Sequence, residues 1–236
     1  MGFTAKQFIA RLYALAPSDA YKGDPPGPGG DGADVFIGVR MGQVFALAKE
    51  CMDMPPAEIE ALLESPIHEV RVGAVSIMDW QARSNKTSEE RRRALFDLYI
   101  RRHDRINTWD LVDRSAIFVV GDFLRDKPLD ILYTLARSDR PMERRTAMLA
   151  CHAFIRRGDL DDTFRIAEVL VADADDLVQK AVGWMLREAG KKDEMRLVRF
   201  LDTHAASMPR VMLRYSIEKL DRRQRDRYLA MKPRGR

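Results

Sequence analysis

The segment INTWDLVDRSA, residues 106–116, places a tryptophan and a carboxylate where they could act together. Thr108 is a residue type that caps helix starts, so we expect a helix to begin at Trp109. Trp109 and Asp113 are four residues apart and would share one face of that helix. An aromatic face attracts cations and a carboxylate stabilises positive charge, so the pair could act on a cationic group. The helix dipole explains Asp110 in the first turn better than it explains Asp113, one turn deeper.

A second tryptophan with a candidate role is Trp184, in the segment DDLVQKAVGWMLREAG, residues 175–190. A single tryptophan at helical spacing is more often a core residue than a site residue. Trp80, near the end of its predicted helix, is interpreted as such a packing residue.

Motifs of the commonest enzyme classes are missing from the sequence. The four histidines and two cysteines show no spacing such as H-x-x-x-H or C-x-x-C, so we expect no metal site. Neither a G-x-S-x-G elbow nor a P-loop occurs. A G-x-G-x-x-G run at Gly27, Gly29 and Gly32 lies in GDPPGPGGDG, residues 23–32, whose prolines exclude the strand that a dinucleotide fingerprint requires. We therefore expect a flexible surface loop there and no cofactor.

Apolar residues recur three and four positions apart along nearly the whole chain, which predicts an all-α fold. The expected helices are 3–16, 42–52, 56–64, 66–83, 88–103, 108–124, 128–137, 141–157, 162–172, 176–190, 192–206, 208–220 and 222–231. Ala74, Ala147, Val182 and Tyr215 occupy one register in similar helices, at spacings of 73, 35 and 33 residues. A repeat of about 35 residues is typical of an α-solenoid of helical pairs, curved and with a concave face. We expect one such domain over residues 1–236.

The charge of the chain is concentrated at its end. The total of +4 is made up of +6 in residues 219–236, with eight basic and two acidic side chains, and −2 in the remainder. An anionic partner would therefore have to be bound mainly by a few placed residues, with the basic tail, 221–236, as a helper. Cys51 and Cys151 lie in apolar sequence and are expected as reduced core residues, in a cytoplasmic protein. Neither a signal peptide nor a membrane-spanning segment is predicted.

Five segments, in their order and spacing, are similar to the AlkD-like DNA alkylation-repair glycosylases, which are built from HEAT-like repeats. They are FIGVR (36–40), TWDLVD (108–113), GDFL (121–124), RRTAML (144–149) and QKAVGWMLRE (179–188). The resemblance extends over residues 36–220. It implies that Trp109, Asp113, Arg145 and Trp184 line a concave DNA-binding surface. Arg144, Lys180 and Arg40, in the same motifs, are further predicted DNA contacts.

The resemblance implies excision of positively charged N3- or N7-alkylpurines from duplex DNA, without base flipping and without a cofactor. Asp113 would stabilise the oxocarbenium-like sugar and position water. Trp109 and Trp184 would face the cationic nucleotide, and Arg145 would hold a phosphate. The protein is expected to act as a monomer in the cytoplasm, associated with the nucleoid.

One departure from the family pattern leaves a second hypothesis open. Where family members can supply a continuous helix with DNA-facing residues, this chain has the loop 23–32, with Tyr21 and Lys22 as the nearby candidates. The alternative is therefore a non-catalytic helical scaffold that binds DNA structures or proteins.

Overall fold

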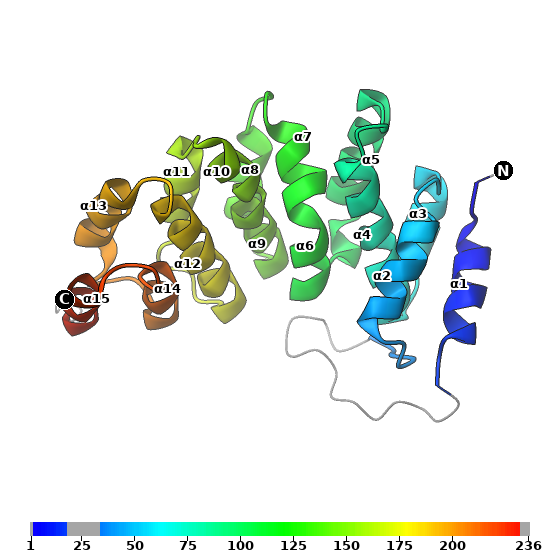
Figure 1. The fold of residues 1–236 in the computed structure, drawn as a ribbon, viewed down its shortest axis with the longest axis horizontal. Coiled ribbons are helices and arrows are strands. Elements are labelled where there is room, and N and C mark those ends of the chain that lie inside the picture. The colour runs from blue at the N-terminus through cyan, green and yellow to red at the C-terminus, as the bar shows by residue number, and fades with distance from the viewer. Residues whose placement is uncertain (1, 18–33, 232–236) are drawn as a thin grey trace. The chain divides into compact units, whose positions relative to one another are not determined.

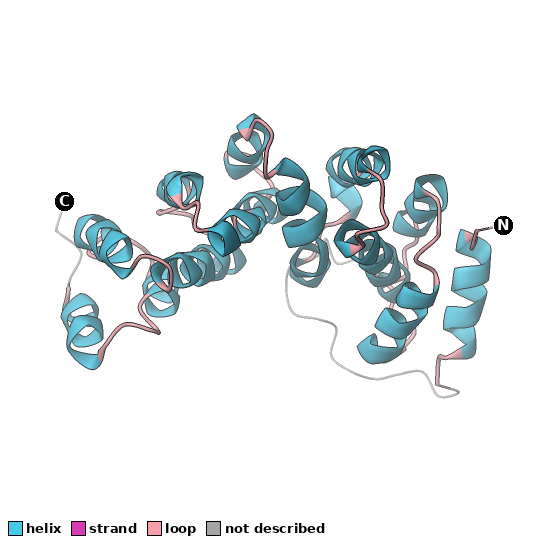
Figure 2. Cartoon of the chain, turned by 45° about the horizontal axis from the view of Figure 1, so that its top comes forward, coloured by secondary structure: helices cyan, strands magenta, loops and turns pink. Residues whose placement is uncertain are grey.

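The computed structural model describes residues 2–17 and 34–231, which form helices joined by loops (Figure 1, Figure 2). In these residues the only extended pairing is an isolated parallel bridge between Val35 and Ile67. The prediction of an all-α chain is confirmed. The loop 23–32 lies outside the described residues, as do Tyr21 and Lys22.

The chain divides into two compact units, Met1–Phe123 and Leu124–Arg236. The first contains α1 (Ala5–Ala14), α2 (Met41–Glu50), α3 (Pro56–Leu63), α4 (His68–Arg83), α5 (Glu89–Arg101) and α6 (Trp109–Ser115). The division falls in α7 (Asp122–Leu124). The second contains α8 (Asp130–Ala136), α9 (Pro141–Ala150), α10 (His152–Arg157), α11 (Asp161–Val169), α12 (Asp176–Gly190), α13 (Glu194–His204), α14 (Arg210–Ser216) and α15 (Arg222–Ala230). A single domain with one concave face stays a prediction.

Each unit is organised around one long helix. In the first unit α4 packs against α2, α3, α5 and α6, and every residue of α4 except Trp80 and Arg83 is buried. In the second unit α12 packs against α9, α13 and α14. Asp175 caps α12, because its carboxylate accepts from the amides of Leu177 and Val178 at 2.9 and 3.0 Å. α12 carries Lys180 and Trp184, and α4 packs against α6, which carries Trp109 and Asp113.

Three of the four residues that were placed in one repeat register are equally buried. Ala74, Ala147 and Val182 are fully buried, in α4, α9 and α12. Tyr215, in α14, is 39 % exposed. The pattern thus identified the buried faces of three helices, and assignment to the HEAT-like class of repeat stays a prediction.

Some predicted helices are interrupted in the structure. The expected helix 108–124 is α6, then a π-helical turn over Ala116–Gly121, then α7. At the transition the hydroxyl of Ser115 donates to the carbonyl of Leu111 at 2.7 Å, a back-bond that competes with regular helix geometry. The expected helix 141–157 is divided at Cys151 into α9 and α10. Periodicity located these helices correctly but could not reveal the local breaks.

Both cysteines are buried and have free thiols, as expected for core residues. Burial raises the pKa of Cys51 to about 11 and that of Cys151 to about 12, so neither thiol is activated as a nucleophile.

Candidate functional site

The first half of the predicted site lies on α6. Trp109 is the first residue of this helix and Asp113 follows one turn later, so the two share a face. Both side chains are partly exposed. Thr108 occupies the N-cap position, as predicted, but its hydroxyl does not cap the helix. It donates instead to Oδ1 of Asp110 at 2.7 Å, which corrects the predicted capping bond.

A group of charged residues, two of them buried and two partly exposed, holds the start of α6. His68, the first residue of α4, is 1 % exposed and lies between two carboxylates. Its Nε2 is 2.7 Å from Oδ2 of Asp110, and its Nδ1 is 3.0 Å from Oδ2 of Asp34. Arg71, also 1 % exposed, donates to Asp34 and, at 2.9 Å, to Asn107. We name Asp34, His68, Arg71 and Asp110 the His68 cluster.

The His68 cluster was not predicted. From the sequence, the helix dipole alone explained Asp110, whereas in the structure Asp110 also bonds to a histidine 42 residues away. No short motif signals this pairing. One available hint is that His68 and Arg71 are three residues apart and therefore lie on the same side of their helix.

A second buried contact holds α6 near Asp113. Arg114, the next residue, donates from Nε to the hydroxyl of Ser76 at 3.1 Å. Its Nη2 is 3.2 Å from Oδ2 of Asp79, a fully buried carboxylate on α4. The guanidinium of Arg114 also lies over the ring of Trp80, 5.3 Å from its centre. Trp80 is therefore part of the packing between helices, in agreement with its interpretation from the sequence.

Arg40 lies in the segment that precedes α2. This segment is held to α4 by Glu69, whose carboxylate accepts from the amides of Ile37, at 3.1 Å, and Gly38, at 2.7 Å. Gly38 has φ +79°, a left-handed conformation that glycine adopts without strain. Arg40 itself is exposed and has extended backbone at the N-cap of α2. Its position is open to a phosphate, and its DNA contact stays a prediction.

The predicted arginines of the second unit are engaged within the protein. Arg145 is 5 % exposed and donates to the carbonyl of Leu177 at the start of α12. Arg144 binds both carboxylate oxygens of Asp173, at 2.7 and 3.1 Å, and donates to the carbonyl of Ser138. Both arginines connect α9 to the region around the start of α12. A phosphate would have to compete with these bonds, and the predicted DNA contacts of both arginines stay predictions.

The second predicted pair lies on α12. Lys180 and Trp184 are four residues apart on one helix face, and both are partly exposed. Gly183, beside Trp184, is where α14 comes closest. A methyl group at this glycine would lie 2.6 Å from the carbonyl oxygen of Met212 and 2.5 Å from Cβ of Tyr215. Glycine is thus required for this close packing of α14 on α12, the helix that carries Trp184.

This packing yields a testable prediction. Gly183→Ala should lower the free energy of unfolding by about 1–3 kcal/mol, because backbone must move to admit the methyl group. Gly42→Ala in α2 is the matched control, since a methyl group there would have no neighbour within 4 Å. We expect the control to be neutral or stabilising by up to about 1 kcal/mol. Urea unfolding of both variants measures this, and equal effects would contradict the role of Gly183.

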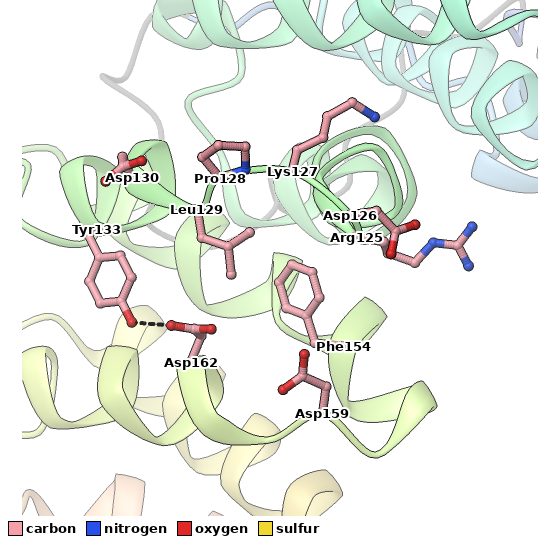
Figure 3. Close-up of a pocket in the computed structure, with 10 residues that line it drawn as sticks. All are labelled: Arg125, Asp126, Lys127, Pro128, Leu129, Asp130, Tyr133, Phe154, Asp159 and Asp162. Atoms are coloured by element: carbon pink, nitrogen blue, oxygen red, sulfur yellow. Dashed lines mark hydrogen bonds between the residues drawn. The ribbon is translucent and has the colours of Figure 1, made fainter.

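A pocket of about 550 Å³ lies in the second unit, between α8 and the α10–α11 region, and is lined by none of the predicted site residues (Figure 3). The hydroxyl of Tyr133 donates to Oδ1 of Asp162 at its edge. Burial and this carboxylate raise the pKa of Tyr133 to about 12, so the phenol stays neutral. In the described part of the chain no group of His, Cys, Asp and Glu side chains is arranged to hold a metal ion. None of the helices in 2–17 and 34–231 is long and apolar enough to cross a membrane.

The structure therefore brings the predicted residues together as two pairs. Trp109 and Asp113 share α6 in the first unit, and Lys180 and Trp184 share α12 in the second. A single surface composed of both pairs stays a prediction. Fold and site together define an all-α protein in which the partly exposed Trp109 and Asp113 lie on α6, a helix that polar contacts hold to α4.

The comparisons with known proteins identify the family. Residues 29–220 match the model of a family described as DNA alkylation repair enzyme, and the chain belongs to this family. A solved structure, described as a predicted DNA alkylation repair enzyme from Enterococcus faecalis, has a TM-score of 0.63 and 18 % identity. The match covers 94 % of this chain and 99 % of that one, and it confirms the all-α solenoid fold. The comparison with curated proteins gives no match.

Membership in this family supports a role in DNA repair and the class of repair enzymes, as the resemblance in the sequence implied. DNA is the partner consistent with that role.

Proposed function

We propose that the protein is a DNA glycosylase that removes N3- and N7-alkylated purines from duplex DNA. The observation that supports this most directly is the pair on α6, where Trp109 and Asp113 share a partly exposed face. The helix that carries them is held to α4 by the His68–Asp110 contact at its start and the Arg114–Asp79 contact near its end. A carboxylate held in this way can act on charge that develops in a transition state, because the protein need not reorganise around it.

The chemistry requires little more than that. Alkylation at N3 or N7 makes the purine cationic, so the base takes the bonding electrons and leaves neutral when the N-glycosidic bond breaks. Positive charge then develops on the sugar, and water adds at C1′ and loses one proton to solvent, which leaves a neutral abasic sugar. Asp113 would stabilise the sugar cation and orient the water. The ring of Trp109 would attract the cationic nucleotide, by about 0.5–2 kcal/mol depending on desolvation.

We further propose that the lesion is bound without base flipping. Selectivity would then rest on the charge and lability of the alkylated nucleotide, with Trp184 and Lys180 contributing a second contact surface. Flipping enzymes need a pocket shaped for the extruded base. The partial exposure of Trp109 and Asp113 on one helix face is compatible with binding on an open surface.

The test is release of 7-methylguanine from methylated duplex DNA by the purified protein. Release that exceeds the spontaneous rate supports the proposal. No release, together with DNA affinity that falls with salt, would favour the non-catalytic DNA-binding scaffold. Affinity that does not depend on salt would count against any role on DNA.

The described part of the basic tail is an ordered helix. Asp221 and Gln224 form a capping box at the start of α15, and the buried Tyr228 donates to Asp202 at 2.9 Å. Arg222 and Arg223 are exposed on this helix. Replacing both by alanine should weaken binding to duplex DNA and lower the slope of log K against log salt by about 2, one for each lost phosphate contact.

The double variant Lys6→Ala/Lys86→Ala is the matched control for this experiment. It removes the same charge from exposed positions in the first unit and should leave the salt slope nearly unchanged. Equal slopes for the wild type and the Arg222→Ala/Arg223→Ala variant would show that the tail does not contact phosphates.

A further inference from the structure

The His68 cluster joins three parts of the first unit at one buried point. Asp34 belongs to the segment that leads to α2, His68 and Arg71 belong to α4, and Asp110 belongs to α6. The histidine ring is closed off from solvent and also packs against Phe36, with the ring centres 4.9 Å apart. Charged side chains are seldom buried unless they are paired, and each member of this cluster faces an oppositely charged partner.

Hydrogen bonding requires His68 to be charged in this arrangement. A neutral imidazole has one donor and one acceptor, whereas the imidazolium has two donors. Each ring nitrogen faces a carboxylate oxygen, at 2.7 Å for Asp110 and 3.0 Å for Asp34, and ionised carboxylates only accept. With His68 protonated, the cluster contains two cations and two anions. Loss of the proton would leave one carboxylate, of Asp34 or Asp110, facing a lone pair, although these side chains are only 14 and 22 % exposed.

α6 depends on tertiary contacts for its position. It has seven residues, and a π-helical turn follows it directly. So short a helix is not stable by itself, and its orientation is determined by what holds it. Asp110 follows Trp109 and precedes Asp113 by three residues, so the bond from His68 acts within one turn of both.

We propose that protonated His68 is a positioning residue that fixes α6, and with it Trp109 and Asp113, by bridging Asp110 and Asp34. As a statement about base release, this rests on the glycosylase function proposed above. The site would then depend on a proton. In this proposal the His68 ring does not contact the substrate, but its charge holds α6, the helix that carries Trp109 and Asp113.

The electrostatics give the direction of the pH dependence. Burial alone would lower the pKa of His68, but the hydrogen bonds and charges of Asp110 and Asp34 outweigh it and raise the pKa. Burial would raise the pKa of Asp110, and the bond to His68 outweighs it and lowers the pKa. Arg71, which binds Asp34, is the remaining charged group of the cluster. The stabilisation from His68 is therefore complete below its unfolded-state pKa and is lost as pH rises through its higher folded-state pKa.

The first experiment measures single-turnover release of 7-methylguanine against pH for the wild type, His68→Gln, Asp110→Asn and the double variant. We expect His68→Gln to be at least about tenfold slower at neutral pH and to lose the decline in rate at high pH. The double variant should be no slower than the slower single variant, because both changes remove one contact. His204→Gln, on α13, is the control and should retain the wild-type profile. A wild-type rate and pH profile in His68→Gln would overturn the proposal.

A second readout does not depend on activity. In a Trp80→Phe/Trp184→Phe background Trp109 is the sole tryptophan, and its fluorescence reports the environment at the start of α6. We expect the emission to change with pH at the midpoint measured for the His68 ring by NMR, and His68→Gln to abolish that change. Asp110→Asn keeps the shape of the side chain and serves if His68→Gln does not fold.

The two readouts separate the two proposals. If the wild-type protein releases no base but the emission of Trp109 follows the titration of His68, the positioning role stands and the glycosylase function fails. If base is released but neither rate nor emission responds to His68→Gln, the positioning role fails and the glycosylase function stands.

Discussion

Replacing Asp113 with asparagine is expected to slow the release of 7-methylguanine from methylated duplex DNA about 100- to 1000-fold. Asparagine keeps the size of the side chain but removes the charge that would stabilise the sugar cation. The magnitude follows from the value of one preorganised electrostatic contact in a transition state, about 3–4 kcal/mol. Asp113 is partly exposed on α6, so the change should leave folding nearly unaffected.

The measurement is a single-turnover assay at saturating protein, with affinity for methylated DNA determined in parallel. Asp97→Asn is the matched control, because Asp97 is an exposed carboxylate on α5 of the same unit. It should release base at the wild-type rate. Equal rates for Asp113→Asn and the wild type would contradict the assigned role of Asp113. A loss of DNA affinity equal to the loss of rate would show that Asp113 acts in binding and not in the chemical step.

Replacing Arg71 with methionine is expected to lower the free energy of unfolding by about 3–5 kcal/mol. Arg71 is 1 % exposed, and its guanidinium binds Asp34, the side chain of Asn107 and the carbonyl of Arg105. Methionine preserves much of the volume of the side chain but removes the positive charge that pairs with the carboxylate of Asp34. Breaking a buried ion pair by removing one partner is costly for this reason.

Arg101→Met provides the comparison. Arg101 also forms an ion pair, with Glu60 at 2.8 Å, but its side chain is 56 % exposed. Solvent screens such a pair, and its loss should cost at most about 1 kcal/mol. Urea unfolding of the two variants at the same pH compares a buried with an exposed arginine. Similar losses would show that the His68 cluster contributes no more to stability than a surface pair.

Much of the fold was predictable because helix periodicity is a local property. Apolar spacing located the helical segments, although two of the predicted helices are divided in the structure, and residues placed in one register proved to be buried in α4, α9 and α12. The breaks at Ser115 and Cys151 were missed. At each break a side chain donates to the carbonyl four residues back, Ser115 to Leu111 and Cys151 to Ala147. Such bonds also occur in unbroken helices, so the sequence could not indicate the breaks.

The candidate site was predictable in part for the same reason. Trp109 and Asp113, like Lys180 and Trp184, are four residues apart, and a helix places such residues on one face regardless of the rest of the protein. The arginines were harder. Arg144 and Arg145 are adjacent in the sequence and both basic, and nothing local indicates that one binds Asp173 and the other the carbonyl of Leu177.

The sequence by itself determined the class of fold and the pairs of residues on single helix faces, because these follow from spacing along the chain. It also indicated the family, through the resemblance of five short segments to known members. Only the tertiary structure decided how α6 is held. His68 meets Asp34 and Asp110 across 34 and 42 residues, and Arg114 meets Asp79 across the same interface between α4 and α6. Pairings of this kind depend on which helices pack together and at what rotation, and hence on the free energy of the whole core rather than on any local pattern.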